Sequence, residues 1–93
     1  MSKSILVVED EHNVAAFIKQ GLVEEGYEVF VAYEGQQGIE LLKQKEIDLL
    51  ILDVILPGMD GRVIAGKIRE LGYDELPIIM LTALGTTENI VQG

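Results

Sequence analysis

The chain contains no cysteine and no tryptophan, and it has no apolar run long enough to cross a membrane. Without cysteine, neither a disulfide framework nor a zinc site built from thiolates is available. The first apolar run, at residues 5–8, ends at a series of acids and is too short for the core of a signal peptide. We therefore expect a soluble, cytoplasmic protein that does not contact a membrane.

Positive charge is also scarce in this sequence. The chain has 7 Lys and Arg residues against 16 Asp and Glu residues, which gives a net charge of -9. Because the phosphate backbone of a nucleic acid would be repelled, we expect no direct contact between this segment and DNA or RNA. An acidic chain is better suited to binding a cation, although a solvated acidic surface accounts for most of these charges.

Aromatic residues are few, at 5% of the chain, while hydrophobic residues reach 48%. The core must therefore consist mainly of Val, Ile and Leu, which is typical of buried parallel strands. With 93 residues, the chain has the length of a single domain, which we assign to residues 1–93.

Strand-like and helix-like patterns alternate along the whole chain, without a linker, repeat or low-complexity segment between them. Short aliphatic or alternating runs predict four strands, at residues 5–8, 27–33, 48–52 and 78–81. Apolar residues at helical spacing predict helices at residues 14–22, 36–45 and 61–71, and the first turns of another at 86–91. This alternation is typical of a parallel sheet with helices on both faces.

Local signals refine these elements. Asp60 is a candidate N-cap for the third helix, and Gly26 and Gly72 stand where the first and third helices should end. Tyr or Val stands at alternate positions from residue 27 to 33, and the charged residues Glu28 and Glu34 lie beside them, which indicates a strand at the edge of the sheet. The first helix is expected to pack on the core through one apolar face, formed by Val14, Phe17, Ile18 and Leu22.

Side chains with oxygen atoms directly follow three of the predicted strands. Glu9 and Asp10 follow the first strand, Asp53 follows the third, and Thr82 follows the fourth. In folds of this kind, ligands bind beyond the carboxyl ends of the strands, where the strand order reverses. If the first, third and fourth strands are neighbours, these acids and this hydroxyl gather at one rim of the sheet.

Carboxylates brought this close repel one another unless a cation lies between them. Mg2+ is the expected cation, because it prefers oxygen ligands and is commonly held by one or two carboxylates and a phosphoryl oxygen. We expect Asp10 and Asp53 to bind it directly, Glu9 to act mostly through water, and the backbone carbonyl of Ile55 to complete the set. Asp53 would then be a nucleophile that forms an aspartyl phosphate, with the Thr82 hydroxyl hydrogen-bonding a phosphoryl oxygen.

Each of these residues also has a simpler interpretation. The acids at residues 9–11 could be caps of the following helix, and Asp53 or Thr82 could be turn residues. His12 is the only histidine, and we expect it to be a solvated side chain at the start of the first helix. The joint placement after the first, third and fourth strands is what favours a functional site.

Three stretches resemble the receiver domain of two-component response regulators, namely ILVVEDE at 5–11, LLILDVILPGMDG at 49–61 and PIIMLTA at 77–83. Their order and spacing cover essentially the whole chain. The resemblance implies that Glu9 and Asp10 form the acidic pair that holds Mg2+. It also implies that Asp53 is the phosphoacceptor and that Thr82 is the switch hydroxyl.

The resemblance further implies a flavodoxin-like, doubly wound parallel sheet with strand order 2-1-3-4, and a signalling role that is not enzymatic. Members of the family take a phosphoryl group from a phosphohistidine on a sensor histidine kinase or phosphotransfer protein, or from donors such as acetyl phosphate. Phosphorylation draws the Thr hydroxyl inward and remodels an output face. By this resemblance the chain is expected to be a two-state switch.

The family pattern is incomplete in this chain. The family has five strand–helix units, whereas residues 1–93 hold three, a fourth strand and the start of a fourth helix. The fifth strand, the fifth helix and the Lys that pairs with the acceptor are missing, and we expect the chain to be a fragment. The fourth strand, at residues 78–81, would then be an exposed apolar edge through which copies of the chain self-associate.

Two apolar residues bear on the expected lifetime of the phosphorylated form. In this family, the residues two positions after the acceptor and two positions after the Thr influence the attack of water. Ile55 and Leu84 occupy these positions, and neither can orient a water molecule by hydrogen bonding. We therefore expect slow autodephosphorylation, although both residues could simply pack.

Other functions remain open at this point. The chain could be an interaction module, or an inactive fragment, that keeps the acidic rim without being phosphorylated. A haloacid dehalogenase-type enzyme would need a second acid two positions after Asp53, where Ile55 stands. A flavodoxin would need a Ser/Thr-rich phosphate loop after the first strand, where acids stand instead.

Overall fold

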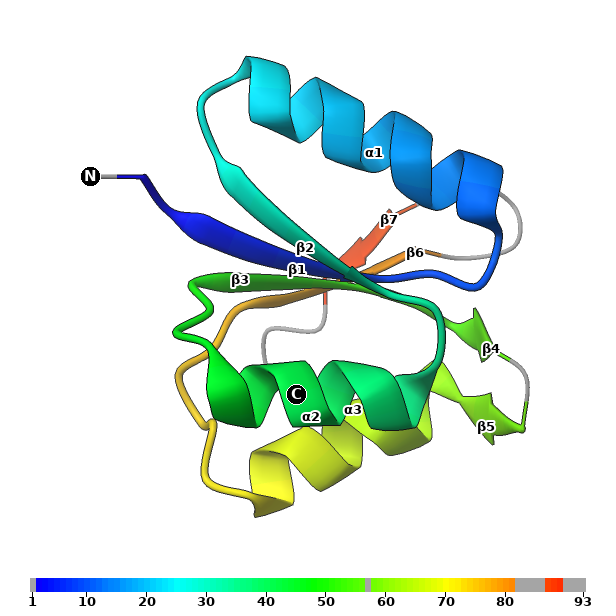
Figure 1. The fold of residues 1–93 in the computed structure, drawn as a ribbon. Coiled ribbons are helices and arrows are strands. Elements are labelled where there is room, and N and C mark those ends of the chain that lie inside the picture. Colours follow the sequence, from blue (N-terminus) through cyan, green and yellow to red (C-terminus); the bar gives the residue numbers. More distant parts are fainter. Residues whose placement is uncertain (1, 57, 82–86, 90–93) are drawn as a thin grey trace.

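The computed structural model describes residues 2–56, 58–81 and 87–89, which form an α/β fold around one five-stranded sheet (Figure 1). Its strands are β1 (Ser4–Val8), β2 (Glu28–Ala32), β3 (Leu49–Asp53), β6 (Ile78–Leu81) and β7 (Thr87–Asn89). Its helices are α1 (His12–Glu24), α2 (Gly35–Gln44) and α3 (Gly61–Glu70). A short hairpin of β4 (Ile55–Leu56) and β5 (Met59–Asp60) lies between β3 and α3.

The strand order is β2-β1-β3-β6-β7, and the first four strands of this row are parallel. Because β6 is the fourth strand of the prediction, the expected order 2-1-3-4 is confirmed. α1 lies on one face of the sheet, and α2 and α3 lie on the other (Figure 1). Central strands covered on both faces have no side open to water, which explains why residues 5–8 are all aliphatic.

Alternation of side chains along the strands divides the core into two parts. Leu6 and Leu50 point to the face of α2 and α3, where the larger cluster of buried residues lies. Ile5 and Val7 point to the opposite face, where Val29 completes a smaller buried cluster on the side of α1. The larger cluster also contains residues from β1, β3, α3 and β6, among them Val8, Leu52, Ile64, Ile68, Ile78 and Met80.

The packing face of α1 differs from its prediction. Phe17 is 78% exposed and Val14 is 42% exposed, so the expectation that both belong to the core is wrong. Ala15 is buried, and Ile18 and Leu22 pack against the smaller cluster. The three inward positions are spaced by three and four residues, whereas Val14 and Phe17 lie beside that stripe around the helix. The apolar arc of α1 is therefore wider than the part that the sheet covers.

The segment after β6 also differs from its prediction. Residues 87–89 form β7, which pairs antiparallel with β6 so that Leu81 lies opposite Thr87 and Ile79 opposite Asn89. The helix predicted for 86–91 is therefore wrong at 87–89, and its other residues lie outside the described part of the chain. The backbone N–H and C=O groups of β6 need partners, and β7 supplies them.

This pairing bears on the predicted self-association. The expectation of a free edge at the fourth strand is wrong for Ile79, Met80 and Leu81, because β7 is hydrogen-bonded along these residues. The structure therefore does not support the predicted self-association of chains along these residues. The other predicted edge is confirmed, since β2 is the first strand of the row and, among the described residues, pairs only with β1.

The predicted helix ends are confirmed. Asp60 caps α3, because its Oδ1 accepts a hydrogen bond from the N–H of Arg62 at 2.7 Å. Gly26 and Gly72 follow α1 and α3 with φ angles of 96° and 103°, a region that favours glycine. Within the described ranges, no helix is long and apolar enough to span a membrane.

Candidate metal centre

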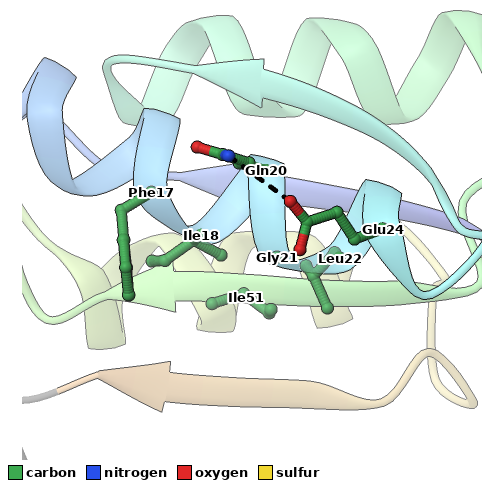
Figure 2. Close-up of a pocket in the computed structure, with 7 residues that line it drawn as sticks. All are labelled: Phe17, Ile18, Gln20, Gly21, Leu22, Glu24 and Ile51. Carbon is green, nitrogen blue, oxygen red and sulfur yellow. Dashed lines mark hydrogen bonds between the residues drawn. The ribbon is translucent and has the colours of Figure 1, made fainter.

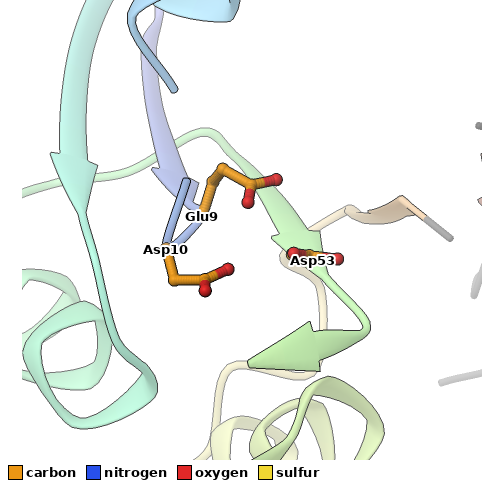
Figure 3. Close-up of side chains that lie close together, drawn as sticks. All are labelled: Glu9, Asp10 and Asp53. Atoms are coloured by element: carbon orange, nitrogen blue, oxygen red, sulfur yellow. The ribbon is translucent and has the colours of Figure 1, made fainter. Parts of the chain in front are cut away.

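Three carboxylates meet at the carboxyl edge of the sheet. Glu9 and Asp10 follow β1, and Asp53 is the last residue of the neighbouring strand β3. Each residue offers one carboxylate oxygen, and these oxygens all lie within 4.8 Å of one another. Figure 3 shows the three side chains gathered around one space. The predicted meeting of these acids at one rim is therefore confirmed.

The sheet itself places these side chains. The N–H of Glu9 donates to the carbonyl of Ala32 at 3.0 Å, which continues the pairing of β1 with β2 by one residue. The N–H of Val54 donates to the carbonyl of Leu81 at 2.9 Å, which extends the pairing of β3 with β6 past Asp53. Glu9 and Asp53 thus lie at paired positions near the ends of parallel strands, and Asp10 directly follows Glu9.

Glu9 is buried, with only 5% of its surface exposed. One of its oxygens, Oε2, accepts a hydrogen bond from the N–H of Glu11 at 3.1 Å. Burial is the main reason why the pKa of Glu9 rises from 4.5 to about 7, and the charges of Asp53 and Asp10 add to it. The N–H of Glu11 acts in the opposite direction. The site therefore contains a carboxyl group whose ionisation is opposed by its surroundings.

The simpler interpretations of these acids are realised only in part. Glu9 does accept a backbone N–H at the start of α1, whereas Glu11, the N-cap residue, makes no capping hydrogen bond with its side chain. Asp53 forms a turn, because its Oδ1 accepts the N–H of Ile55 at 3.2 Å. A carboxylate has about four lone-pair sites, so one such bond leaves Asp53 free to accept others. Asp10 accepts no hydrogen bond from the residues that the structure describes.

Two further residues were predicted to belong to the site, Ile55 and Thr82. Ile55 begins the β4–β5 hairpin and is 60% exposed, so its side chain is not part of the core. Thr82 and Leu84 lie outside the described residues, and the hydroxyl predicted for this rim has no described position.

An aromatic pair at the start of α1 was missed by the sequence reasoning. The rings of His12 and Tyr33 are stacked, with centroids 3.9 Å apart and planes at 23°. His12 is exposed, as predicted, and Tyr33 directly follows β2. The backbone N–H of Tyr33 also donates to Oε1 of Gln37 at 2.9 Å. The available signal in the sequence was an aromatic residue directly after the strand that pairs with β1.

An apolar groove lies elsewhere on the molecule. It runs between α1 and β3 and has a volume of about 480 Å3, and two of its lining residues, Gln20 and Glu24, are joined by a hydrogen bond (Figure 2). None of the three acids contributes to its wall, so it is separate from the candidate metal centre. It is lined by Phe17, Ile18, Gln20, Gly21, Leu22, Glu24 and Ile51.

Comparison with known proteins identifies the family. The family model of the response regulator receiver domain matches residues 5–93, which is nearly the whole chain. The chain therefore belongs to the response regulator receiver domain family, and the resemblance noted from its motifs is confirmed.

Solved structures agree with this assignment. The response regulator TrrA from Thermotoga maritima, solved in complex with Mg(2+)-BeF, is 43% identical, with a TM-score of 0.81 over 87% of this chain and 70% of that one. A CheY-like receiver domain protein from Methanospirillum hungatei is 32% identical, with a TM-score of 0.83 over 88% of this chain and 65% of that one. The chain thus spans about two thirds of the length of these relatives.

A third structure contains a partner. TrrA of Thermotoga maritima, solved in complex with the histidine kinase ThkA, is 42% identical to this chain, with a TM-score of 0.81 over 87% of this chain and 69% of that one. Receiver domains are signalling domains of two-component systems, and the flavodoxin-like sheet described above is the fold of this family.

Proposed function

We propose that this chain accepts a phosphoryl group on Asp53 from a phosphohistidine of a sensor histidine kinase or phosphotransfer protein, in a Mg2+-dependent reaction, and acts as a signalling switch. The observation that carries the proposal is the convergence of three carboxylates within 4.8 Å at the carboxyl edge of the sheet. In this proposal residues 1–93 act as one receiver domain, which functions in the cytoplasm. The phosphoryl donor is the proposed partner, and ThkA bound to TrrA is the supporting precedent.

The donor set fits Mg2+. All three side chains offer carboxylate oxygens, the ligand type that this hard cation prefers. Asp10 and Asp53 would hold it directly, Glu9 would act mostly through water, and the carbonyl of Ile55 would complete the protein's share. When bound, the ion supplies positive charge that offsets the charge of the transferring group. TrrA solved with Mg(2+)-BeF supports this assignment.

Asp53 performs the covalent step. One of its carboxylate oxygens attacks the phosphorus atom, and the P–N bond of the phosphohistidine breaks as the new P–O bond forms. The electron pair of the broken bond leaves with the imidazole of the donor, which carries a proton on its other ring nitrogen and therefore departs as a neutral histidine. The product is an aspartyl phosphate on this chain. We assign the hydrogen bond to the transferred group to the hydroxyl of Thr82.

The position of Asp53 suits this role. It is half-buried at the end of β3, and the N–H of Ile55 holds its Oδ1. A carboxylate fixed in this way has fewer orientations to lose when it attacks.

Intact-mass measurement after incubation with acetyl phosphate tests the proposal. We expect the chain to gain the mass of one phosphoryl group only when Mg2+ is present, and Asp53→Asn to gain none. Asp60→Asn is the matched control, because it removes a carboxylate from the same loop while Asn keeps the capping ability at the start of α3. A gain that persists in Asp53→Asn, or the absence of any gain in the natural chain, would contradict the proposal.

A further inference from the structure

Gly61 begins α3 and lies against the backbone of the proposed acceptor residue. A Cβ atom placed on Gly61 would overlap the carbonyl oxygen of Asp53. The same atom would lie 2.8 Å from Cα of Val54 and 3.0 Å from the carbonyl carbon of Asp53. The start of α3 can therefore approach the end of β3 this closely only if residue 61 has no side chain.

Steric contact, rather than an unusual backbone angle, explains why residue 61 is glycine. Three of the described glycines, Gly26, Gly58 and Gly72, have positive φ angles, and Gly61 is not among them. An L-residue could adopt the backbone angles of Gly61 without strain. The contact with the backbone of Asp53 and Val54 is what excludes a side chain here.

A hydrogen bond joins the same two segments. The N–H of Gly61 donates to the carbonyl of Val54 at 2.7 Å, which closes the loop that contains the β4–β5 hairpin. Asp53 immediately precedes this loop, and its own carboxylate accepts the N–H of Ile55. Gly61 thus fixes the backbone at this point. The direction of the Asp53 carboxylate depends on the position of that backbone.

Other tightly packed glycines differ from Gly61 in what they touch. A Cβ on Gly35 would meet the side chain of Ile64, and one on Gly38 would meet the side chain of Val8. Side chains can rotate or shift to relieve such contacts, whereas the backbone of Asp53 can only move as a whole. A side chain at residue 61 would push the end of β3 by about half an ångström or more, which exceeds the tolerance of a preorganised site.

We propose that Gly61 is a positioning residue for Asp53: the bare backbone of Gly61, pressed against the Asp53–Val54 peptide, sets the direction of the Asp53 carboxylate toward Glu9 and Asp10. This role rests on the proposed function only where phosphoryl transfer is concerned. The alignment of the carboxylates themselves can be tested without it.

Gly61→Ala is the test variant, and Gly66→Ala is its matched control. Both replace a glycine of α3 by the best helix former, but a Cβ on Gly66 meets nothing within 4 Å. Each variant is compared with the natural chain by urea unfolding, by the NMR amide shifts of Asp53, Val54 and Ile55, by calorimetric titration with MgCl2, and by the rate of labelling with acetyl phosphate.

In folded Gly61→Ala we expect displaced amide resonances at Asp53 and Val54 and a Mg2+ dissociation constant raised about tenfold. We also expect a labelling rate lowered by roughly ten- to a hundredfold. Gly66→Ala should match the natural chain in all three measurements. Unchanged amide shifts and unchanged Mg2+ affinity in a folded Gly61→Ala would overturn the proposal, because a merely structural role would alter only the unfolding midpoint.

A failure of the proposed function is distinguishable from a failure of this inference. If the natural chain takes no phosphoryl group, the amide shifts and the MgCl2 titration still decide whether Gly61 positions Asp53. If Gly61→Ala does not fold, an amide-to-ester replacement at residue 61 removes the hydrogen bond to Val54 without adding volume. Shifted Asp53 resonances and weaker Mg2+ binding in the ester would support the proposal, and unchanged values would overturn it.

Discussion

Glu9 is the residue at which the fold and the candidate site are in conflict. It is the one charged residue that the described part of the chain buries, and its closest ionisable neighbours are also acids. Burying an ionised carboxylate next to like charges costs free energy, because neither water nor a cation stabilises it. Its pKa of about 7 expresses this cost. A site built for a cation carries such a cost whenever the cation is absent.

The raised pKa of Glu9 predicts a pH-dependent stability of the metal-free chain. In the window from 4.5 to about 7, the folded state binds more protons than the unfolded state, so the free energy of unfolding falls as the pH rises. At about pH 8 the ionised Glu9 destabilises the fold by roughly 3 kcal/mol. Glu9→Gln should therefore be more stable than the natural chain at about pH 8, and the difference should vanish as the pH falls below 4.5.

Urea unfolding in the presence of EDTA, at several pH values, checks this prediction. Glu11→Gln is the control, because it removes an acid two residues away that is exposed. It should reproduce neither the gain at high pH nor its loss at low pH. An equal gain in the free energy of unfolding for Glu9→Gln at every pH would show that ionisation of Glu9 does not destabilise the fold.

At the scale of elements, the side chain of Arg69 makes several hydrogen bonds to the connection from α3 to β6. Nη1 of Arg69 donates to the carbonyls of Tyr73, Asp74 and Leu76 at 2.6, 3.2 and 2.8 Å. These carbonyls belong to the turn that brings the chain from the end of α3 to the start of β6. The hydroxyl of Tyr73 donates to the carbonyl of Leu42 at 3.3 Å, which ties the same turn to α2.

Arg69→Met is expected to lower the free energy of unfolding by about 2–3 kcal/mol, because it leaves partly buried carbonyls without their charged donor. Lys67→Met, an exposed substitution in the same last turn of α3, should change it by less than about 0.5 kcal/mol. Urea denaturation of both variants provides the comparison. Equal effects of the two substitutions would mean that the Arg69 contacts contribute no net stability.

At the scale of the whole molecule, negative charge dominates. The net charge of -9 on 93 residues predicts self-repulsion in the folded state, which salt should screen. A specific metal centre adds a second effect, since a ligand that binds only the folded state stabilises it by mass action. These two effects can be separated because only the second depends on the three carboxylates.

We expect MgCl2 to raise the thermal midpoint more than NaCl at equal ionic strength. The additional stabilisation should reach about 2 kcal/mol once free Mg2+ exceeds its dissociation constant by about thirtyfold. Asp10→Asn should lose this additional effect while keeping the response to NaCl. Differential scanning calorimetry of both chains is the measurement, and identical responses to the two salts in the natural chain would argue against a specific site.

Much of the fold could be predicted because its signals are local. The strand at Ile78–Leu81 was predicted with its observed bounds, and the Asp60 cap and the stop at Gly72 follow from backbone chemistry within a few residues. The meeting of Glu9 with Asp53 was also predictable, because parallel strands bring their carboxyl ends to the same edge. The family motifs added the order of the strands.

Other features were decided only by the tertiary structure. The exposure of Phe17 depends on how much of α1 the sheet can cover. The helical spacing of apolar residues in the sequence does not show how wide the covered part is. Residues 87–89 became a strand because β6 offered an unpaired edge. The burial of Glu9 that raises its pKa, its approach to Asp53 and the close contact of Gly61 with Asp53 all depend on segments that are distant along the chain. The sequence alone determined the three helices, the four parallel strands and the oxygens that follow those strands, since these depend on near neighbours along the chain. Packing determined which faces are covered and how closely two backbones approach, because both depend on residues brought together only by folding.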